Sequence, residues 1–244
     1  MIKEYLNACI NLIYPEEGVC FICDEYYTTG IEDHICPLCR KHINRIGDHI
    51  CSICGKPLEK GYIPHICHEC IQFKRYFDRA IAPVVYEGRI KEAIHRYKYN
   101  KKPYMYKVFG PMMMKKLIEE DMDSFDIIVP VPLHRKRWIN RGFNQSLLLA
   151  KYISKIIDKP IIDKRLIKKI DTTAQNKLDK IERLKNVKGA FKVKKGEIFK
   201  NKEILLIDDV FTTGATVNEC SKILKEAGGK KVYVLTIARA VFSF

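Results

Sequence analysis

The sequence has no long apolar segment: no run approaches the roughly 18 to 20 residues that a membrane-spanning helix needs. Its first five residues also lack the charged and then apolar layout of a signal peptide. Both absences favour a cytoplasmic protein without a transmembrane segment.

Acidic residues are scarce, with 29 Asp and Glu against 44 Lys and Arg, which gives a net charge of +15. Such a balance favours polyanionic partners, because neutralising phosphates releases counterions. A merely solvated basic surface has the same composition, so charge alone does not identify the partner. Apolar residues are plentiful, at 47% of 244 residues, which is enough for one or two domains with a true core.

Cysteine is unusually frequent and regularly spaced. Eight of the ten cysteines form four Cys-x-x-Cys pairs within the first 70 residues. A Cys-x-x-Cys turn places two thiolates on one metal, so two turns complete a tetrahedral zinc site. We predict two structural four-cysteine zinc sites, formed in sequence order, with a cross-braced pairing of the first and third turns as the alternative. The predicted ligands are Cys20, Cys23, Cys36 and Cys39, then Cys51, Cys54, Cys67 and Cys70.

Composition changes near residue 75, which predicts two domains, 1–75 and 76–244. The first begins with an amphipathic helix over residues 2–13 and continues as the cysteine module. The second alternates strands and helices, a pattern typical of a parallel, doubly wound α/β sheet. We expect strands at 80–86, 125–131, 161–166, 203–207 and 231–238, helices at 89–97, 104–120, 144–157 and 214–227, and a mobile loop at 171–188.

A strand followed by a polar turn, residues 204–216, carries the most specific chemistry. Asp208 and Asp209 follow the apolar strand, and threonines with a glycine then open a helix. Backbone N–H groups and hydroxyls at a helix N-terminus bind phosphate, and glycine permits close approach. Carboxylates repel phosphate, so they must serve another group, such as ribose hydroxyls or a magnesium shell. Phosphate next to a diol indicates a sugar phosphate.

A second cluster follows the strand that ends at Val131. Four cations, Arg135, Lys136, Arg137 and Arg141, lie close to the same expected sheet edge. They suit a diphosphate with magnesium, although a solvated basic turn has the same sequence. Trp138 in this segment either packs against the sheet or stacks on a base.

The thirteen residues 204–216 resemble the signature of type I phosphoribosyltransferases. Together with the cysteine pairs, residues 131–137 and residues 141–145, they resemble the ComF competence family over about residues 20–239. The resemblance implies a type I phosphoribosyltransferase-like sheet preceded by a double zinc ribbon. It implies that Asp208 and Asp209 hold the ribose hydroxyls of phosphoribosyl diphosphate, bound with Mg²⁺. It also implies a 5′-phosphate site at Thr212, Thr213, Gly214, Ala215 and Thr216, and a diphosphate loop with Leu133, His134, Arg135 and Arg141.

Between residues 88 and 107, seven cations accompany one acid and four tyrosines. Cations on phosphates and aromatic rings under bases are typical of single-strand binding. Tyrosines in the core and lysines in water explain the pattern equally well. The nucleic-acid candidates are Arg96, Tyr97, Lys98, Tyr99, Lys101 and Lys102.

The resemblance implies a role in DNA uptake and natural transformation, with single-stranded DNA handled at the inner face of the membrane beside the uptake channel and other competence proteins. No general base and no acceptor pocket stand out, so the catalytic residues stay unknown. The alternative is a phosphoribosyltransferase that acts on a nucleobase or another small acceptor. A plain salvage enzyme has no use for two zinc ribbons.

Overall fold

The computed structural model describes residues 18–59, 61–171 and 187–241. The helix expected at 2–13, Cys9 and most of the polar stretch 171–188 lie outside these ranges. Within them, no helix is both long enough and apolar enough to cross a membrane.

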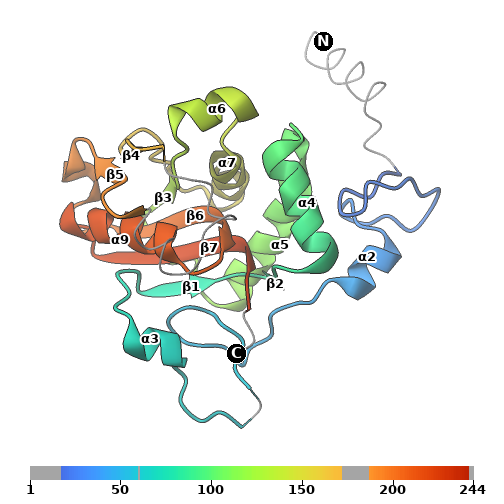
Figure 1. Ribbon diagram of the computed structural model, residues 1–244, viewed down its shortest axis with the longest axis horizontal. Coiled ribbons are helices and arrows are strands. Elements are labelled where there is room, and N and C mark those ends of the chain that lie inside the picture. The colour runs from blue at the N-terminus through green and yellow to red at the C-terminus, as the bar shows by residue number, and fades with distance from the viewer. Residues whose placement is uncertain (1–17, 60, 172–186, 242–244) are drawn as a thin grey trace.

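A five-stranded parallel sheet forms the centre of the molecule (Figure 1). Its strands are β1 (Arg79–Ile81), β2 (Val84–Val85), β3 (Ile127–Pro130), β6 (Glu203–Phe211) and β7 (Lys231–Arg239). The order is β1-β7-β6-β3, and β2 also pairs with β7. All pairings are parallel, so the carboxyl ends of the strands meet at one edge. The predicted parallel α/β sheet is confirmed.

Helices cover both faces of the sheet. Helices α4 (Gly88–Tyr99), α5 (Tyr106–Glu119) and α7 (Gln145–Ile157) share one apolar core with alternate β6 and β7 side chains, among them Leu205, Ile207, Leu235 and Ile237. Helix α9 (Ala215–Glu226) shares the other core with Ile204, Leu206, Val232 and Val234. This alternation is the period of two expected for a strand that is buried on both faces.

The central strand β6 is longer than predicted. Its pairing with β7 continues past both aspartates to Phe211, which lies opposite Arg239. The carboxylates therefore belong to the strand instead of following it. The strand expected at 80–86 is instead divided into β1 and β2. Pro83, which lacks an N–H and cannot donate to a neighbouring strand, lies between them.

Two further predictions are corrected. The strand expected at 161–166 is reduced to a single bridge from Ile161 to Ile128, and β4 (Leu166–Lys168) instead pairs antiparallel with β5 (Phe191–Val193). The basic segment after β3 is a helix, α6 (Arg135–Arg141), and its N-cap His134 accepts a hydrogen bond from the backbone N–H of Lys136. Short 3₁₀ turns occupy Pro103–Met105 and Gly196–Phe199.

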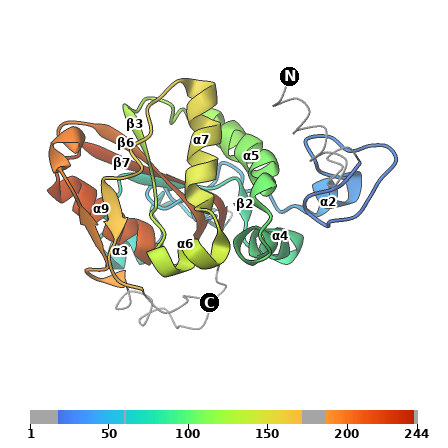
Figure 2. The same ribbon diagram turned by 90° about the horizontal axis from the view of Figure 1, so that it is seen from above.

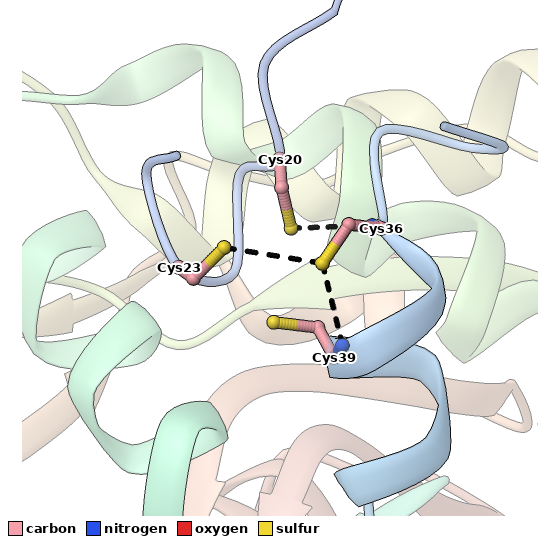
Figure 3. A group of neighbouring side chains, drawn as sticks. All are labelled: Cys20, Cys23, Cys36 and Cys39. Atoms are coloured by element: carbon pink, nitrogen blue, oxygen red, sulfur yellow. Dashed lines mark hydrogen bonds between the residues drawn. The ribbon is translucent and has the colours of Figure 1, made fainter. Parts of the chain in front are cut away.

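The eight paired cysteines form two separate groups in sequence order. In each group all four sulfur atoms lie within 4.8 Å of one another. Figure 3 shows the first group, in which Cys23 Sγ and Cys36 Sγ are 4.0 Å apart. A tetrahedron with Zn–S bonds of about 2.3 Å separates its sulfurs by about 3.8 Å, so both groups fit zinc. The sequential arrangement, not the cross-braced one, matches this structure.

Each cysteine group carries one short helix, α2 (Pro37–His42) or α3 (His68–Gln72). Cys36 and Cys67 are their N-caps. The α2 group lies on the side of the molecule near α4, whereas the α3 group lies below β1 (Figures 1 and 2). The two ribbons therefore contact different parts of the sheet domain.

Candidate phosphoribosyl site

A cavity of about 410 Å³ opens at the carboxyl edge of the sheet. It is lined by the end of β6 with the start of α9, the loop after β3 with α6, the start of α7, one side of α4, the β4–β5 pair and the segment after β7. The side chains used below are Lys98 and Tyr99 from α4, Leu133 after β3, Arg137 and Arg141 from α6, Gln145 from α7, Lys168 from β4, and Asp208, Asp209, Thr212 and Thr216. Most of them carry hydrogen-bonding or charged groups.

A small niche adjoins this cavity at the N-terminus of α9. It is lined by Thr212, Gly214, Ala215 and Thr216, with Phe211 behind them. Gly214 is the N-cap and has φ +76°. A Cβ there would lie 2.4 Å from Phe211 Cζ, so both the conformation and the space require glycine. Backbone N–H groups at a helix start favour an anion, which makes the niche suitable for a phosphate.

Thr213 differs from the other predicted phosphate residues. It is buried and lines neither cavity. Its hydroxyl accepts a hydrogen bond from Ala215 N at 3.4 Å, and its carbonyl accepts one from Arg75 at 3.3 Å. Thr213 thus shapes the turn.

Asp208 and Asp209 are buried side by side on β6, with 8% and 6% of their surface exposed. Asp208 Oδ1 accepts hydrogen bonds from Ser146 Oγ at 3.1 Å and from Asp209 N at 2.9 Å. Among the described residues, none donates to Asp208 Oδ2. Asp208 lines both the cavity and the niche, so it is the carboxylate with an oxygen available to a ligand.

Asp209, in contrast, is fully engaged. Its Oδ1 pairs with Lys98 Nζ at 2.7 Å, and its Oδ2 accepts a hydrogen bond from Gln145 Nε2 at 2.6 Å. A buried carboxylate requires such partners, because leaving water is costly for a charge. Burial opposes the charge of Lys98, but Asp209 outweighs this effect and raises the pKa of Lys98.

Burial, followed by the neighbouring charge of Asp209, raises the pKa of Asp208 to about 7. A carboxyl group poised near neutrality in a polar cavity is typical of a functional site. A ligand that supplies hydroxyl donors or a cation would favour the ionised form of the Asp208 carboxyl group.

The basic side of the cavity contains Arg137, Arg141 and Lys168. Burial lowers the pKa of Arg141 and of Lys168. Arg141 donates to the side-chain oxygen of Gln145 and lies over the Tyr99 ring, 5.3 Å from its centroid. Of the predicted diphosphate residues, Leu133 and Arg141 line the cavity, whereas His134 and Arg135 do not. Arg137 and Lys168 line the cavity as well.

The predicted nucleic-acid stretch does not form one surface. Tyr97 is completely buried and its hydroxyl donates to Gln145 O at 3.0 Å, so the prediction of Tyr97 as a stacking residue is wrong. Lys98 points inward to Asp209. Arg96 donates to Ile22 O, and Lys102 pairs with Asp24, both in the first ribbon. Only Tyr99, about half exposed, and Lys101 retain outward positions.

Several site residues were not identified from the sequence. Gln145 and Ser146 stand at the first turn of α7, where Asn144 is the N-cap and its side-chain amide donates to Val131 O at 3.1 Å. The segment 141–145 indicated this region but gave no roles. Lys168 had no signal at all, because β4 reaches the cavity only through its pairing with β5.

Comparison with known proteins gives the family. Residues 9–71 match the double zinc ribbon domain, and residues 143–240 match the phosphoribosyl transferase domain. Competence protein F of Haemophilus influenzae is 29% identical over 75% of this chain and 82% of its own. Competence protein ComFC of Bacillus subtilis is 27% identical over 89% and 82%, respectively. The two domain matches and these relatives together support a ComF-like family for this chain.

DNA utilization protein YhgH of Escherichia coli is 26% identical over 92% of this chain and 91% of its own length. The match with YhgH therefore spans both the cysteine module and the sheet domain of this chain. The resemblance inferred from the cysteine pairs and residues 204–216 is confirmed, and the two cysteine groups are structural zinc sites of the ribbon domain.

The raised pKa of Asp208 predicts a pH-dependent stability. A carboxyl group with a raised folded-state pKa stabilises the fold at low pH, and this stability is lost as the pH rises through about 7. We therefore expect Asp208→Asn to raise the free energy of unfolding, with a gain about 1–2 kcal/mol larger at pH 8 than at pH 5.5. Urea unfolding in zinc-containing buffer measures it. An equal gain at both pH values would contradict a raised pKa of the buried Asp208 carboxyl group.

Proposed function

We propose that this protein binds phosphoribosyl diphosphate with Mg²⁺ in the cavity and uses this site while handling single-stranded DNA during uptake. The observation that carries the first part is the pairing of two buried carboxylates with a phosphate niche on one strand-turn-helix unit. The phosphoribosyl transferase match over residues 143–240 supports it.

In this proposal each part of the ligand has its own partners. Asp208 accepts hydrogen bonds from a ribose hydroxyl. Asp209, which pairs with Lys98 and Gln145, keeps the ammonium group of Lys98 near the sugar. The 5′-phosphate occupies the niche of Thr212, Gly214, Ala215 and Thr216, with Thr213 shaping the turn. The diphosphate lies toward Leu133, Arg137, Arg141 and Lys168, whereas Arg135 and His134, the N-cap of α6, lie outside the cavity.

The donor set fits Mg²⁺. This ion prefers oxygen ligands and is usually held by one or two carboxylates together with substrate phosphates. Asp208 Oδ2 is the protein oxygen available for it. When bound, the ion neutralises diphosphate charge, while the protein's own cations orient the diphosphate and its carboxylates orient the ribose.

The DNA role comes from the relatives and from charge. The relatives are named as competence and DNA utilization proteins. This chain has a net charge of +15. Helix α6 is the best-placed contact surface, since Arg135 and Lys136 are exposed beside Trp138, which is 53% exposed. We place this action at the cytoplasmic side of the membrane, with the uptake channel and competence proteins as partners.

A transfer reaction is the second candidate. The cavity extends past the carboxylates to Tyr86, Lys91 and His95, which leaves space beside the phosphoribosyl site for an acceptor such as a nucleobase. Release of diphosphate in the presence of a panel of bases distinguishes an enzyme from a binding protein.

Titration calorimetry with phosphoribosyl diphosphate and Mg²⁺ tests the ligand. We expect wild-type protein to bind, and Asp208→Asn to weaken binding at least tenfold at pH 8, because the amide cannot accept the hydroxyl and magnesium contacts as a carboxylate does. Asp163→Asn is the matched control, since Asp163 is exposed and lines neither cavity. Its affinity should equal that of wild type. No binding by wild type, or equal binding by Asp208→Asn, would refute the site.

Fluorescence anisotropy with labelled single strands tests the DNA role. Contacts to about three to six phosphates give a slope of about −2 to −4 for log K against log salt. Trp138→Ala should weaken binding about fivefold or more through lost stacking. Tyr26→Ala, which removes a ring that is 67% exposed in the first ribbon, should have no effect. Binding that is absent or insensitive to salt would refute this role, and equal losses in both variants would refute the α6 surface.

A further inference from the structure

In each zinc ribbon, a cysteine sulfur accepts a hydrogen bond from an arginine of the sheet domain. Arg89, at the start of α4, donates to Cys39 Sγ at 3.1 Å. Arg239, at the end of β7, donates to Cys54 Sγ at 3.2 Å and to Cys54 O at 2.7 Å. The two contacts differ in surroundings, because Arg89 is exposed whereas Arg239 is only 2% exposed.

Arg239 also contacts the support of the phosphate niche. Its guanidinium lies 4.2 Å from the centroid of the Phe211 ring. That ring is packed edge-on against Phe77, which enters the sheet domain from the second ribbon, with centroids 5.8 Å apart. The tip of the ring, at Cζ, approaches Gly214 so closely that no Cβ fits there. Phe211 thus contacts both Arg239 and the N-cap of α9.

A second connection runs beside the first. The segment that leaves the second ribbon holds the turn through Arg75, which donates to Thr213 O at 3.3 Å and lies 3.8 Å from Glu69 of α3. Tyr76 N donates to the side-chain oxygen of Asn218 at 2.8 Å, in the first turn of α9. Both ends of the phosphate turn are therefore tied to residues that follow Cys67 and Cys70.

The two ribbons also belong to different apolar cores. Cys51, Cys54 and Cys67 belong to the core that contains Phe211, Ala215 and Val217. The cysteines of the first ribbon belong instead to the core under α4 and α5. Only the second ribbon lies directly behind the niche.

We propose that Arg239 is a positioning residue for the 5′-phosphate niche, and that zinc in the second ribbon and anion binding at α9 are energetically coupled through it. Four thiolates on one Zn²⁺ carry a net charge of about −2, which holds the buried guanidinium in place. A ribbon of this size folds mainly through its metal, so zinc loss would release Arg239, Phe77 and Arg75 together. Coupling is reciprocal, so an anion in the niche must raise the zinc affinity of the second ribbon. The proposal rests on the phosphoribosyl function above.

Two measurements on the full-length protein test it: binding of ribose 5-phosphate by calorimetry, and zinc transfer to a coloured chelator with and without ribose 5-phosphate. In wild type, ribose 5-phosphate should raise the zinc affinity of one of the two sites about fivefold or more, measured at equilibrium with the chelator. Arg239→Lys keeps the charge but loses the two-pronged contact and the stacking. We expect it to retain two zinc ions at purification, bind ribose 5-phosphate about fivefold more weakly, and lose this rise in zinc affinity.

Arg89→Lys is the matched control, because it alters the same kind of contact at the first ribbon. Its affinity for ribose 5-phosphate should stay within twofold of wild type, and ribose 5-phosphate should still raise the zinc affinity of one site. If wild type binds neither ribose 5-phosphate nor phosphoribosyl diphosphate, the proposed function and this coupling both fail. If wild type binds and Arg239→Lys behaves like wild type in both assays, or Arg89→Lys loses affinity equally, the coupling alone fails.

Discussion

The burial of two adjacent carboxylates on the central strand constrains the rest of the site. Asp208 and Asp209 lie in a strand that is otherwise apolar, and neither can lose its water without compensation. The compensation comes from Lys98 on α4 and from Gln145 and Ser146 at the start of α7. The same two helices pack on one face of the sheet. Their positions are therefore fixed both by the polar contacts to the carboxylates and by the packing of the apolar core. One oxygen of Asp208 remains available to a ligand.

The sequence predicted the elements whose signal is local. The cysteine spacing, the strand-turn-helix at residues 204–216 and the apolar strand before Val131 all lie in short segments, and the structure contains each of them. Lys98 is an example of a site residue whose position the sequence does not reveal. In the sequence it belongs to a run of cations and tyrosines, and only the rotation of α4 against the sheet reveals that it faces Asp209 while Tyr97 enters the core. Lys168 depends on a strand pairing between distant segments, which no local pattern reveals.

The zinc ribbons are joined to the site by specific contacts. The first ribbon contacts Arg96 of α4 and Lys102 shortly after this helix, and α4 carries Lys98, which pairs with Asp209. The second ribbon supports the phosphate turn through Arg75 and Arg239. A small metal-dependent module thereby supports the candidate site of the α/β domain. This arrangement gives a physical reason for the two parts to occur in one chain.

A crystal structure of the protein with phosphoribosyl diphosphate and Mg²⁺ tests the central claim most directly. The account predicts the ribose hydroxyls within hydrogen-bonding distance of Asp208, the 5′-phosphate on the N–H groups of Gly214, Ala215 and Thr216, and the diphosphate beside Arg137 and Arg141. A ligand bound elsewhere, or a ligand whose phosphate avoids the start of α9 while Asp208 faces only protein and water, would contradict it.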